Sequence, residues 1–320
     1  MLASWPTRPS IPRADLSTQR NVEGRDSSRP FFVVCLADCP ETMSGNNTNN
    51  SSAGNDLASH ARADVQEALD RQLAPLGQRA MAALGPMPGE RVIDLGCGTG
   101  QTSLDLAQAV GASGAVLGID ISAVVLEQAR QRSGDCAQLE FVLHDAATYP
   151  FEAGAFDAAF SRFGVMFFSD PVAAFNNIRY ALKRGGRLAF VCWRNEQEND
   201  VDEVPLRAAR PFLKPQPVSD PNPPGPFSFA NPDRVRALLT AAGFEDIKIV
   251  PYDEQVGSGD LETALTLALR VGSLGKIVRE APELRAAVVE PVRAALAKHE
   301  RPQGVMLNAA TWIVTARLPL

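Results

Sequence analysis

The sequence predicts an α/β fold with one doubly wound, seven-stranded, mostly parallel sheet of Rossmann-like type, and two observations support this. From residue 92 onward, short apolar runs alternate with segments of helix-forming composition. Nearly continuous apolar strands in such an alternation indicate a parallel sheet that helices cover on both faces. The first run also ends in a carboxylate and three alternating glycines, before a helical segment. A strand, a glycine turn and a helix in this order let the backbone approach a nucleotide-like ligand closely.

Residues 1–57 differ in composition from the rest of the chain. They are rich in Pro, Arg, Ser and Asn, and residues 46–52 form a polar, low-complexity run. Such a segment buries too little apolar surface to offset its conformational entropy, so we expect it to be disordered. The folded domain is then expected over residues 58–320. Translation from Met43 is an alternative that would make residues 1–42 an extension, and the intact mass of the natively expressed protein tests it.

Within residues 58–320 the hydrophobic pattern predicts the elements in order. Apolar residues recur every three or four positions between Val65 and Leu84, which predicts helix, and Pro75 and Gly77 are expected to divide it into two. Strands are predicted at residues 92–95, 115–119, 139–143, 156–161, 187–193, 244–250 and 305–318. The helices predicted between them lie at residues 102–110, 123–132, 171–182 and 232–242.

Two longer stretches interrupt this alternation. Residues 194–230 are rich in proline and indicate a loop with a short helix near residues 204–212. Residues 258–302 carry apolar stripes that predict two helices, at residues 261–271 and 284–296. Because added segments of this kind carry specificity, we expect them to supply the lid and the walls of a ligand pocket.

The glycine turn is flanked by two carboxylates. Asp94 ends the first apolar run, just before the loop at residues 96–100. Asp120 lies twenty residues after Gly100, at the end of the second run. A carboxylate at that place can accept hydrogen bonds from both hydroxyls of a ribose. The sequence therefore predicts a cofactor that contains adenosine.

The details of the loop favour S-adenosylmethionine (SAM) over a dinucleotide. The third glycine comes one residue earlier than in the dinucleotide fingerprint, and Gln101 occupies the dinucleotide position. The negative charge of Asp94 opposes a pyrophosphate but suits an ammonium group, and SAM has an ammonium, a ribose and no phosphate. An NAD-linked oxidoreductase is the alternative, which NADH binding without SAM binding would favour. A non-catalytic SAM-binding regulatory module is a second alternative.

Composition excludes several classes of partner. The 320 residues carry a net charge of −6, so no basic surface for nucleic acid is expected. No apolar run reaches the roughly 20 residues of a membrane span, so we expect no integral membrane association. The five cysteines have no zinc-like spacing, which predicts no metal site and free thiols in a reducing cytoplasm.

With these motifs in place, the chain resembles the class I SAM-dependent methyltransferases. It is most similar to their branch of ubiquinone and menaquinone C-methyltransferases and related small-molecule enzymes. The resemblance covers about residues 60–320, and one of its motifs usually has Pro where Arg184 stands. Besides the glycine loop, the motifs that carry it are Gly118-Ile119-Asp120-Ile121-Ser122, Asp145-Ala146 with Pro150-Phe151, Phe156-Asp157 and Leu182-Lys183-Arg184-Gly185-Gly186.

The resemblance implies a sheet order of 3-2-1-4-5-7-6 with strand seven antiparallel and residues 258–302 inserted between strands six and seven. It implies that Asp94 and the glycine loop hold the methionine end of SAM. Asp120 would bind the ribose, Ile121 would pack on the adenine, Asp145 would bind its amino group, and Ser161 would lie near the reacting methyl. The full set of implied cofactor ligands is Asp94, Gly96, Cys97, Gly98, Thr99, Gly100, Asp120, Ile121, Asp145, Ala146 and Ser161.

The predicted activity is methyl transfer from SAM to a small-molecule acceptor by in-line SN2 displacement. Carbon or oxygen acceptors are favoured over nitrogen, because Asn222-Pro223-Pro224 lies some sixty residues after the place of the amino-methyltransferase motif and lacks its aromatic residue. No general base is identified; His144 and Arg162 are the candidate catalytic residues by position. Arg162, Phe163, Met166 and Phe167 follow the fourth strand and could line the acceptor pocket.

Overall fold

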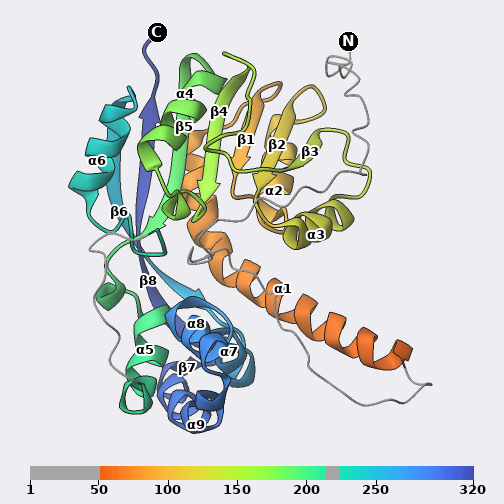
Figure 1. Cartoon of the computed structure of the whole chain (residues 1–320), viewed down its shortest axis with the longest axis vertical. Helices are drawn as coiled ribbons and strands as arrows, with labels where there is room; N and C mark the ends of the chain where they lie inside the picture. The colour runs from red at the N-terminus through yellow and green to blue at the C-terminus, as the bar shows by residue number, and fades with distance from the viewer. Residues whose placement is uncertain (1–50, 214–223) are drawn as a thin grey trace, which may run out of the picture.

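The computed structural model describes residues 51–213 and 224–320, and its centre is a twisted, mostly parallel sheet (Figure 1). The strands run in the order β3-β2-β1-β4-β5-β8-β6, and β8 is antiparallel to both β5 and β6. The predicted topology is therefore confirmed, with β8 as the seventh strand of the predicted order. The strands are β1 Arg91–Leu95, β2 Ala115–Asp120, β3 Leu139–Leu143, β4 Phe156–Arg162, β5 Leu182–Trp193, β6 Glu245–Gly257 and β8 Gly304–Arg317.

Helices cover both faces of the sheet. α1 and α2 contact each other over the middle strands, while α4 and α6 contact each other over β5 and β6. Capping residues fix where they begin: Asp170 accepts a hydrogen bond from the Ala173 amide at the start of α4, and Asn231 does the same at α6. These helices are α2 Gln101–Val110, α3 Ala123–Ser133, α4 Pro171–Ala181 and α6 Pro232–Ala241.

The N-terminal helix differs from its prediction. α1 spans Ser51–Leu84 as one helix that continues through Pro75 and Gly77, with a bend visible in Figure 1. A proline removes one hydrogen bond and kinks a helix, but packing on both sides of the kink can preserve the helix. Residues 51–57, predicted to be disordered, are the first turns of α1. Residues 1–50, with the alternative start at Met43, lie outside the described residues, so the boundary at residue 58 stays a prediction.

A second, helical lobe lies below the sheet in Figure 1. The insertion holds three helices instead of the predicted two, because α8 begins at Gly272, where the turn after α7 breaks the apolar stripe. This lobe consists of α5 Asp200–Ala209, α7 Leu261–Ala268, α8 Gly272–Glu280, α9 Arg285–Leu296 and the short β7 Glu300–Arg301. Single 3-10 turns at Val165–Phe167, Glu196–Glu198, Arg210–Phe212, Pro282–Leu284 and Ala297–His299 complete the described elements.

Each lobe has its own hydrophobic core, and two connections join them. The sheet core includes the fully buried Phe160, Phe175 and Phe190, whereas Val288 and Val292 belong to the core of the helical lobe. β6 and β8 extend from the sheet into that lobe as one antiparallel pair. α1 supplies the second connection, because its residues 65–69 pack against Leu267 of α7.

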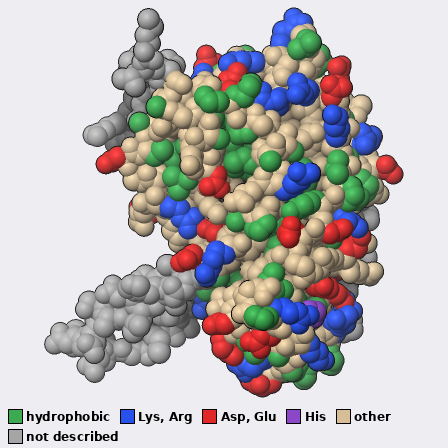
Figure 2. All heavy atoms as spheres, turned by 180° about the vertical axis from the view of Figure 1, so that it is seen from behind, with side chains coloured by type: hydrophobic (Ala, Val, Ile, Leu, Met, Phe, Trp, Pro, Cys, Tyr) green, Lys and Arg blue, Asp and Glu red, His purple; other side chains and the backbone are tan. Residues whose placement is uncertain are grey.

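On the face shown in Figure 2, Lys and Arg side chains are scattered among Asp and Glu over both lobes. None of the helices in the described part of the chain is both long enough and apolar enough to cross a bilayer.

Candidate functional site

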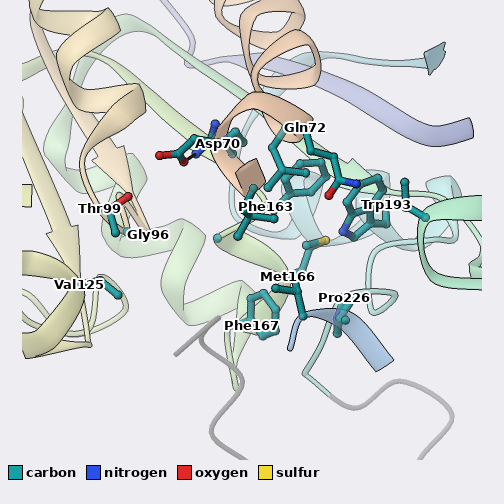
Figure 3. A pocket seen from close by; sticks show the side chains of 18 of the residues that line it. Asp70, Gln72, Gly96, Thr99, Val125, Phe163, Met166, Phe167, Trp193 and Pro226 are labelled. Carbon is teal, nitrogen blue, oxygen red and sulfur yellow. Dashed lines mark hydrogen bonds and ion pairs between the residues drawn. The ribbon is translucent and has the colours of Figure 1, made fainter. Parts of the chain in front are cut away.

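A cavity of about 700 Å³ lies at the carboxyl ends of β1, β2 and β4, between the sheet, α1 and the helical lobe. Ligands of open α/β sheets bind at this edge, where the strand order reverses. Figure 3 shows Gly96 and Thr99 on one side of the cavity, and Trp193, Met166 and Pro226 on the other. Phe163 lies between the two groups. The cavity therefore has a glycine-loop end and an aromatic end.

The glycine loop forms one wall because its backbone adopts conformations that favour glycine. Gly96 has φ +66°, and a Cβ there would lie 2.9 Å from the Cα of Gly164, which follows β4. A Cβ on Gly164 would in turn lie 2.6 Å from the carbonyl oxygen of Leu95. The two loops therefore touch backbone to backbone, which other residues would prevent. This contact joins the glycine loop to the segment that leads into the aromatic end.

Asp120 holds the position predicted for a ribose-binding carboxylate. One of its oxygens accepts a 2.9 Å hydrogen bond from the Gly98 amide, and the other accepts one of 2.9 Å from the Ser122 amide. Its side chain is nearly buried and lines the cavity. Burial raises the pKa of this carboxyl, while the amide hydrogen bonds act to lower it. Each oxygen keeps a lone pair for a further donor.

The ends of β2 and β3 form an apolar shelf beside Asp120. Ile121 is 46% exposed although it is a large apolar residue, and it lines the cavity. Asp145 and Ala146 line the same region, and Asp145 accepts a 2.8 Å hydrogen bond from the Ala147 amide. An exposed apolar side chain next to a carboxylate and free backbone groups suits a flat heterocycle with polar edges.

Three of the implied cofactor ligands do not line the cavity. Asp94 is fully buried below the loop, where it accepts hydrogen bonds from the hydroxyls of Thr102 (2.7 Å) and Ser103 (2.6 Å). Ser161 is also fully buried; it donates to the Leu95 carbonyl at 2.8 Å and accepts from the Gly164 amide. Gly100 begins α2. The structure therefore places Asp94 and Ser161 as supports of the two loops, and the other eight implied residues at the cavity.

Asp94 is a strongly perturbed carboxyl beneath the glycine loop. Its burial raises the pKa to about 6, and the hydroxyl donors Ser103 and Thr102 oppose the rise. Its Oδ1 is buried and has no hydrogen-bond partner within the described residues. Both hydroxyl donors come from the first turn of α2, whose positive dipole end also favours a negative charge.

Arg162, a candidate catalytic residue, belongs to an ion-pair network. Its guanidinium pairs with Asp70 of α1 at 3.1 Å and also donates to Gln101. Asp70 is nearly buried and forms a second ion pair, of 2.7 Å, with Arg132 of α3. Because a guanidinium stays protonated, Arg162 cannot act as a base. Within this network, two guanidiniums share one carboxylate.

His144, the other candidate, lies on the side of the cavity that holds the apolar shelf. It follows β3, its ring is exposed, and its Nδ1 lies 3.0 Å from the Asp145 carbonyl oxygen. β3 is three strand positions away from β4, or roughly 14 Å at the usual strand spacing. The structure therefore does not bring His144 to the aromatic end.

The aromatic end is built by the segments after β4 and β5. Phe163 has a left-handed φ of 62°, and its ring stacks on Trp193 with centroids 4.2 Å apart. A bulky residue in this conformation is strained, and strain of this kind clusters at functional sites. Met166 and Phe167 line the cavity as predicted, and Pro224 and Pro226 close it; Asn222 and Pro223 lie outside the described residues.

Several polar residues of the cavity were missed by the sequence analysis. Gln72 of α1 donates a buried 2.6 Å hydrogen bond to Ser258, which links α1 to the start of the insertion. Asp202 of α5 accepts hydrogen bonds from the amide and the hydroxyl of Ser273. Glu196 lies outside the cavity lining, where it accepts a hydrogen bond from the Ser273 hydroxyl; burial, followed by the neighbouring Asp202, raises its pKa. No motif could have revealed these residues, because they lie on helices far apart in sequence.

The sheet order, together with a glycine loop after β1 and a carboxylate at the end of β2, is that of a Rossmann-like methyltransferase fold. Residues 92–186 match the family model described as "Methyltransferase domain". Over this region the chain is similar to that family. Within the described residues, no group of three His, Cys, Asp or Glu side chains is placed to hold a metal ion.

Two curated relatives and one solved structure illustrate the likeness. Aklanonic acid methyltransferase DauC of Streptomyces sp. (strain C5) is 36% identical over 118 residues, which is 36% of this chain and 54% of that one. Demethylmenaquinone methyltransferase of Staphylococcus saprophyticus is 26% identical over 182 residues, which is 54% of this chain and 77% of that one. YcgJ protein from Bacillus subtilis shares 16% identity, with a TM-score of 0.49 over 78% of this chain and 98% of that one.

The region that matches the family model, residues 92–186, extends from β1 into β5. The chain spans about half the length of several of the curated relatives it matches, at 54%, 46% and 49%. The helical lobe, which begins with α5, lies outside the region that matches the family model. Its side chains at the cavity therefore have to be interpreted from this structure.

Proposed function

We propose that this protein is a SAM-dependent methyltransferase that transfers a methyl group to a flat, largely apolar small molecule. The observation that carries the proposal is Asp120, held by two backbone amides at the wall of a cavity that continues into an aromatic end. Its glycine-loop end would hold the nucleoside, and the aromatic end would hold the acceptor. The net charge of −6 supports a small molecule over nucleic acid as the acceptor.

The residues of the glycine-loop end fit SAM in charge and shape. Asp120 offers two oxygens to a pair of adjacent hydroxyls, and Ile121 offers an apolar surface to a purine. Asp145 and the backbone of Ala146 would meet the polar edge of that purine. The cavity also lies beside Arg162, where a carboxylate can be accommodated. Asp94, which the sequence assigned to the ammonium group, would act indirectly by supporting the loop.

The aromatic end suits a planar acceptor. Phe163 stacks on Trp193, and Met166 and Phe167 add adaptable apolar contacts. We place the methylated atom at carbon or oxygen. The end of β4 and the residues that follow it read Ser161-Arg162-Phe163-Gly164, which lacks the Asn-Pro-Pro arrangement that orients an acceptor nitrogen.

Positioning accounts for the catalysis that these residues can supply. When bound, SAM supplies a methyl group on a sulfonium, which is already a good leaving group. The chain's own contribution is to hold the acceptor atom in line and to exclude water, and effective molarities of roughly 10⁵–10⁸ M are attainable in this way. His144 and Arg162 are not suited to remove a proton, so a carbon or oxygen acceptor would react as its own anion or enol.

Calorimetry with S-adenosylhomocysteine (SAH) and transfer of labelled methyl test the proposal. SAH should bind at one site, and labelled SAM should methylate a component of a metabolite extract that mass spectrometry can identify. Binding of NADH without SAH would support the oxidoreductase alternative instead. The relatives and the solved structure described above do not support that alternative. SAH binding without any methyl transfer would favour a regulatory module.

We place this activity in the cytoplasm. Cys97, Cys136 and Cys192 are free thiols, which fits a reducing compartment. We also retain the proposal that the folded domain comprises residues 58–320 with an insertion at 258–302.

A further inference from the structure

The helical lobe contributes one cation to the cavity that has no partner among the described residues. Arg270 lies in the turn between α7 and α8, is half-buried and lines the cavity. The structure gives its guanidinium no hydrogen bond and no ion pair with any described side chain. An unpaired guanidinium at the wall of a cavity keeps all of its donors available to a bound ligand.

The other ionised side chains of the cavity all have internal partners. Asp70 and Arg162 pair with each other, and Asp120 accepts two amide hydrogen bonds. Asp202 is bound by Ser273, and the Arg279 guanidinium donates to the Arg270 carbonyl at 2.9 Å. Asp145 accepts from a backbone amide. Arg270 is therefore the exception within the described part of the lining.

The backbone at Arg270 is held firmly in place. Its amide donates to the Leu267 carbonyl at 3.0 Å, and its own carbonyl accepts from Arg279. A Cβ on Gly275 would lie 2.4 Å from the carbonyl carbon of Arg270, so α8 packs directly on this turn. The neighbours Leu267 and Val271 line the same cavity with apolar surface. The backbone of Arg270 is thus held in place at a wall that these apolar side chains share with Asp202 and Arg279.

We infer that Arg270 determines acceptor specificity, and that the acceptor is a flat aromatic molecule carrying an anionic oxygen, either a carboxylate or an ionised phenol. The aromatic end accepts the ring system, and the guanidinium of Arg270 accepts the anionic substituent, for which its planar donors are suited. This inference rests on the proposed function, since it names the substrate class of the same site. The helical lobe would then select charged acceptors over neutral acceptors of equal size.

Matched pairs of planar probes test the inference on the SAH-saturated protein. Anthraquinone carboxylate and its carboxamide have the same ring system, and hydroxynaphthoquinone, ionised at neutral pH, is compared with its methyl ether. Calorimetry should show about tenfold to hundredfold tighter binding of the anion in at least one pair, as expected for a hydrogen bond to a charged group. The pair that shows the preference distinguishes a carboxylate from a phenol.

Variants assign that preference to Arg270. In R270Q the anionic probe should weaken to the affinity of its neutral partner, while the neutral probe is unchanged. R270K should keep part of the preference, because it keeps the charge and loses the planar donor arrangement. R301Q, a change of the same type at an exposed residue of β7, should behave like the wild type.

Three results would overturn the inference. The first is wild-type protein that does not distinguish the members of either pair. The second is R270Q that keeps the preference. The third is that R270Q binds SAH more weakly than the wild type in the absence of any probe. Arg270 would then bind the carboxylate of the cofactor. Failure of SAH to bind the wild type would instead refute the proposed function, so the two failures are distinguishable.

Discussion

At the scale of single residues, the site separates side chains that contact a ligand from side chains that hold them. Asp120 faces the cavity, whereas Asp94 and Ser161 are fully buried and fix the two loops on either side of it. Sequence alone could identify all three as polar residues at strand ends. It could not tell their orientation, because that depends on which donors lie nearby after folding. For Asp94 those donors are Thr102 and Ser103.

Asp120→Ala should weaken SAH binding by about tenfold to hundredfold, because it removes a charged acceptor for the ribose hydroxyls. The change also frees the Gly98 amide, so the fold has to be checked by its melting temperature. Calorimetry of the variant beside Asp157→Ala, which alters a carboxylate outside the cavity, measures the effect. Equal affinity in Asp120→Ala and wild type would contradict the assignment.

Asp94→Asn should abolish a pH-dependent part of the stability. The folded protein raises the pKa of Asp94 to about 6 from an ordinary value of 3.8. Between pH 3.8 and about pH 6, the Asp94 carboxyl is therefore protonated in the folded state and ionised in the unfolded state. Its contribution to stability rises as the pH falls through about 6. Relative to Asp94→Asn, the wild type should gain up to about 3 kcal/mol of unfolding free energy between about pH 7 and pH 4. Urea unfolding at several pH values measures this, and a constant difference would show that Asp94 titrates normally.

At the scale of elements, the site depends on the contact between the β1 and β4 loops. Gly96 and Gly164 approach each other backbone to backbone, and the residue between β4 and that glycine, Phe163, carries the strained φ of 62°. The strand–glycine–helix motif could be predicted because all its parts are local. The partner loop could not, since Gly164 lies far along the chain and resembles an ordinary turn glycine.

Gly164→Ala should weaken SAH binding by more than about tenfold while the protein remains folded, because a Cβ would force the Leu95 carbonyl and the Gly96 loop to move. Gly154→Ala is a suitable control. That residue also has a positive φ, of 58°, but a Cβ there meets no atom within 4 Å. If both variants bind SAH alike, the close approach of the loops does not shape the site.

At the scale of the whole molecule, two lobes enclose the cavity, and only one of them could be predicted in detail. The sheet follows from apolar runs that alternate with helices. In the insertion, α8 escaped prediction because Gly272 and Gly275 interrupt its stripe. Its contacts with α5 and α7 join segments far apart in sequence. For the same reason Asp70, which is separated from Arg162 by 92 positions, could not be recognised as part of the site.

Ligand binding should stabilise the whole molecule, because both lobes and α1 line one cavity. At a SAH concentration one hundred times the Kd, the unfolding free energy should rise by about 2.7 kcal/mol. Thermal unfolding with and without SAH measures this. Asp120→Ala should show a smaller rise at the same concentration, and an equal rise in both proteins would place the ligand elsewhere.

The ion pairs of Asp70 limit how far this protein can be shortened from its N-terminal side. The carboxylate that neutralises part of the charge on Arg132 and Arg162 comes from α1, upstream of the recognisable methyltransferase stretch at residues 92–186. A fragment that begins at Arg91 would retain every signature motif and leave both guanidiniums without their anion. The stretch that matches the family model, residues 92–186, is therefore shorter than the stretch that supplies these ion pairs, because Asp70 lies upstream of it.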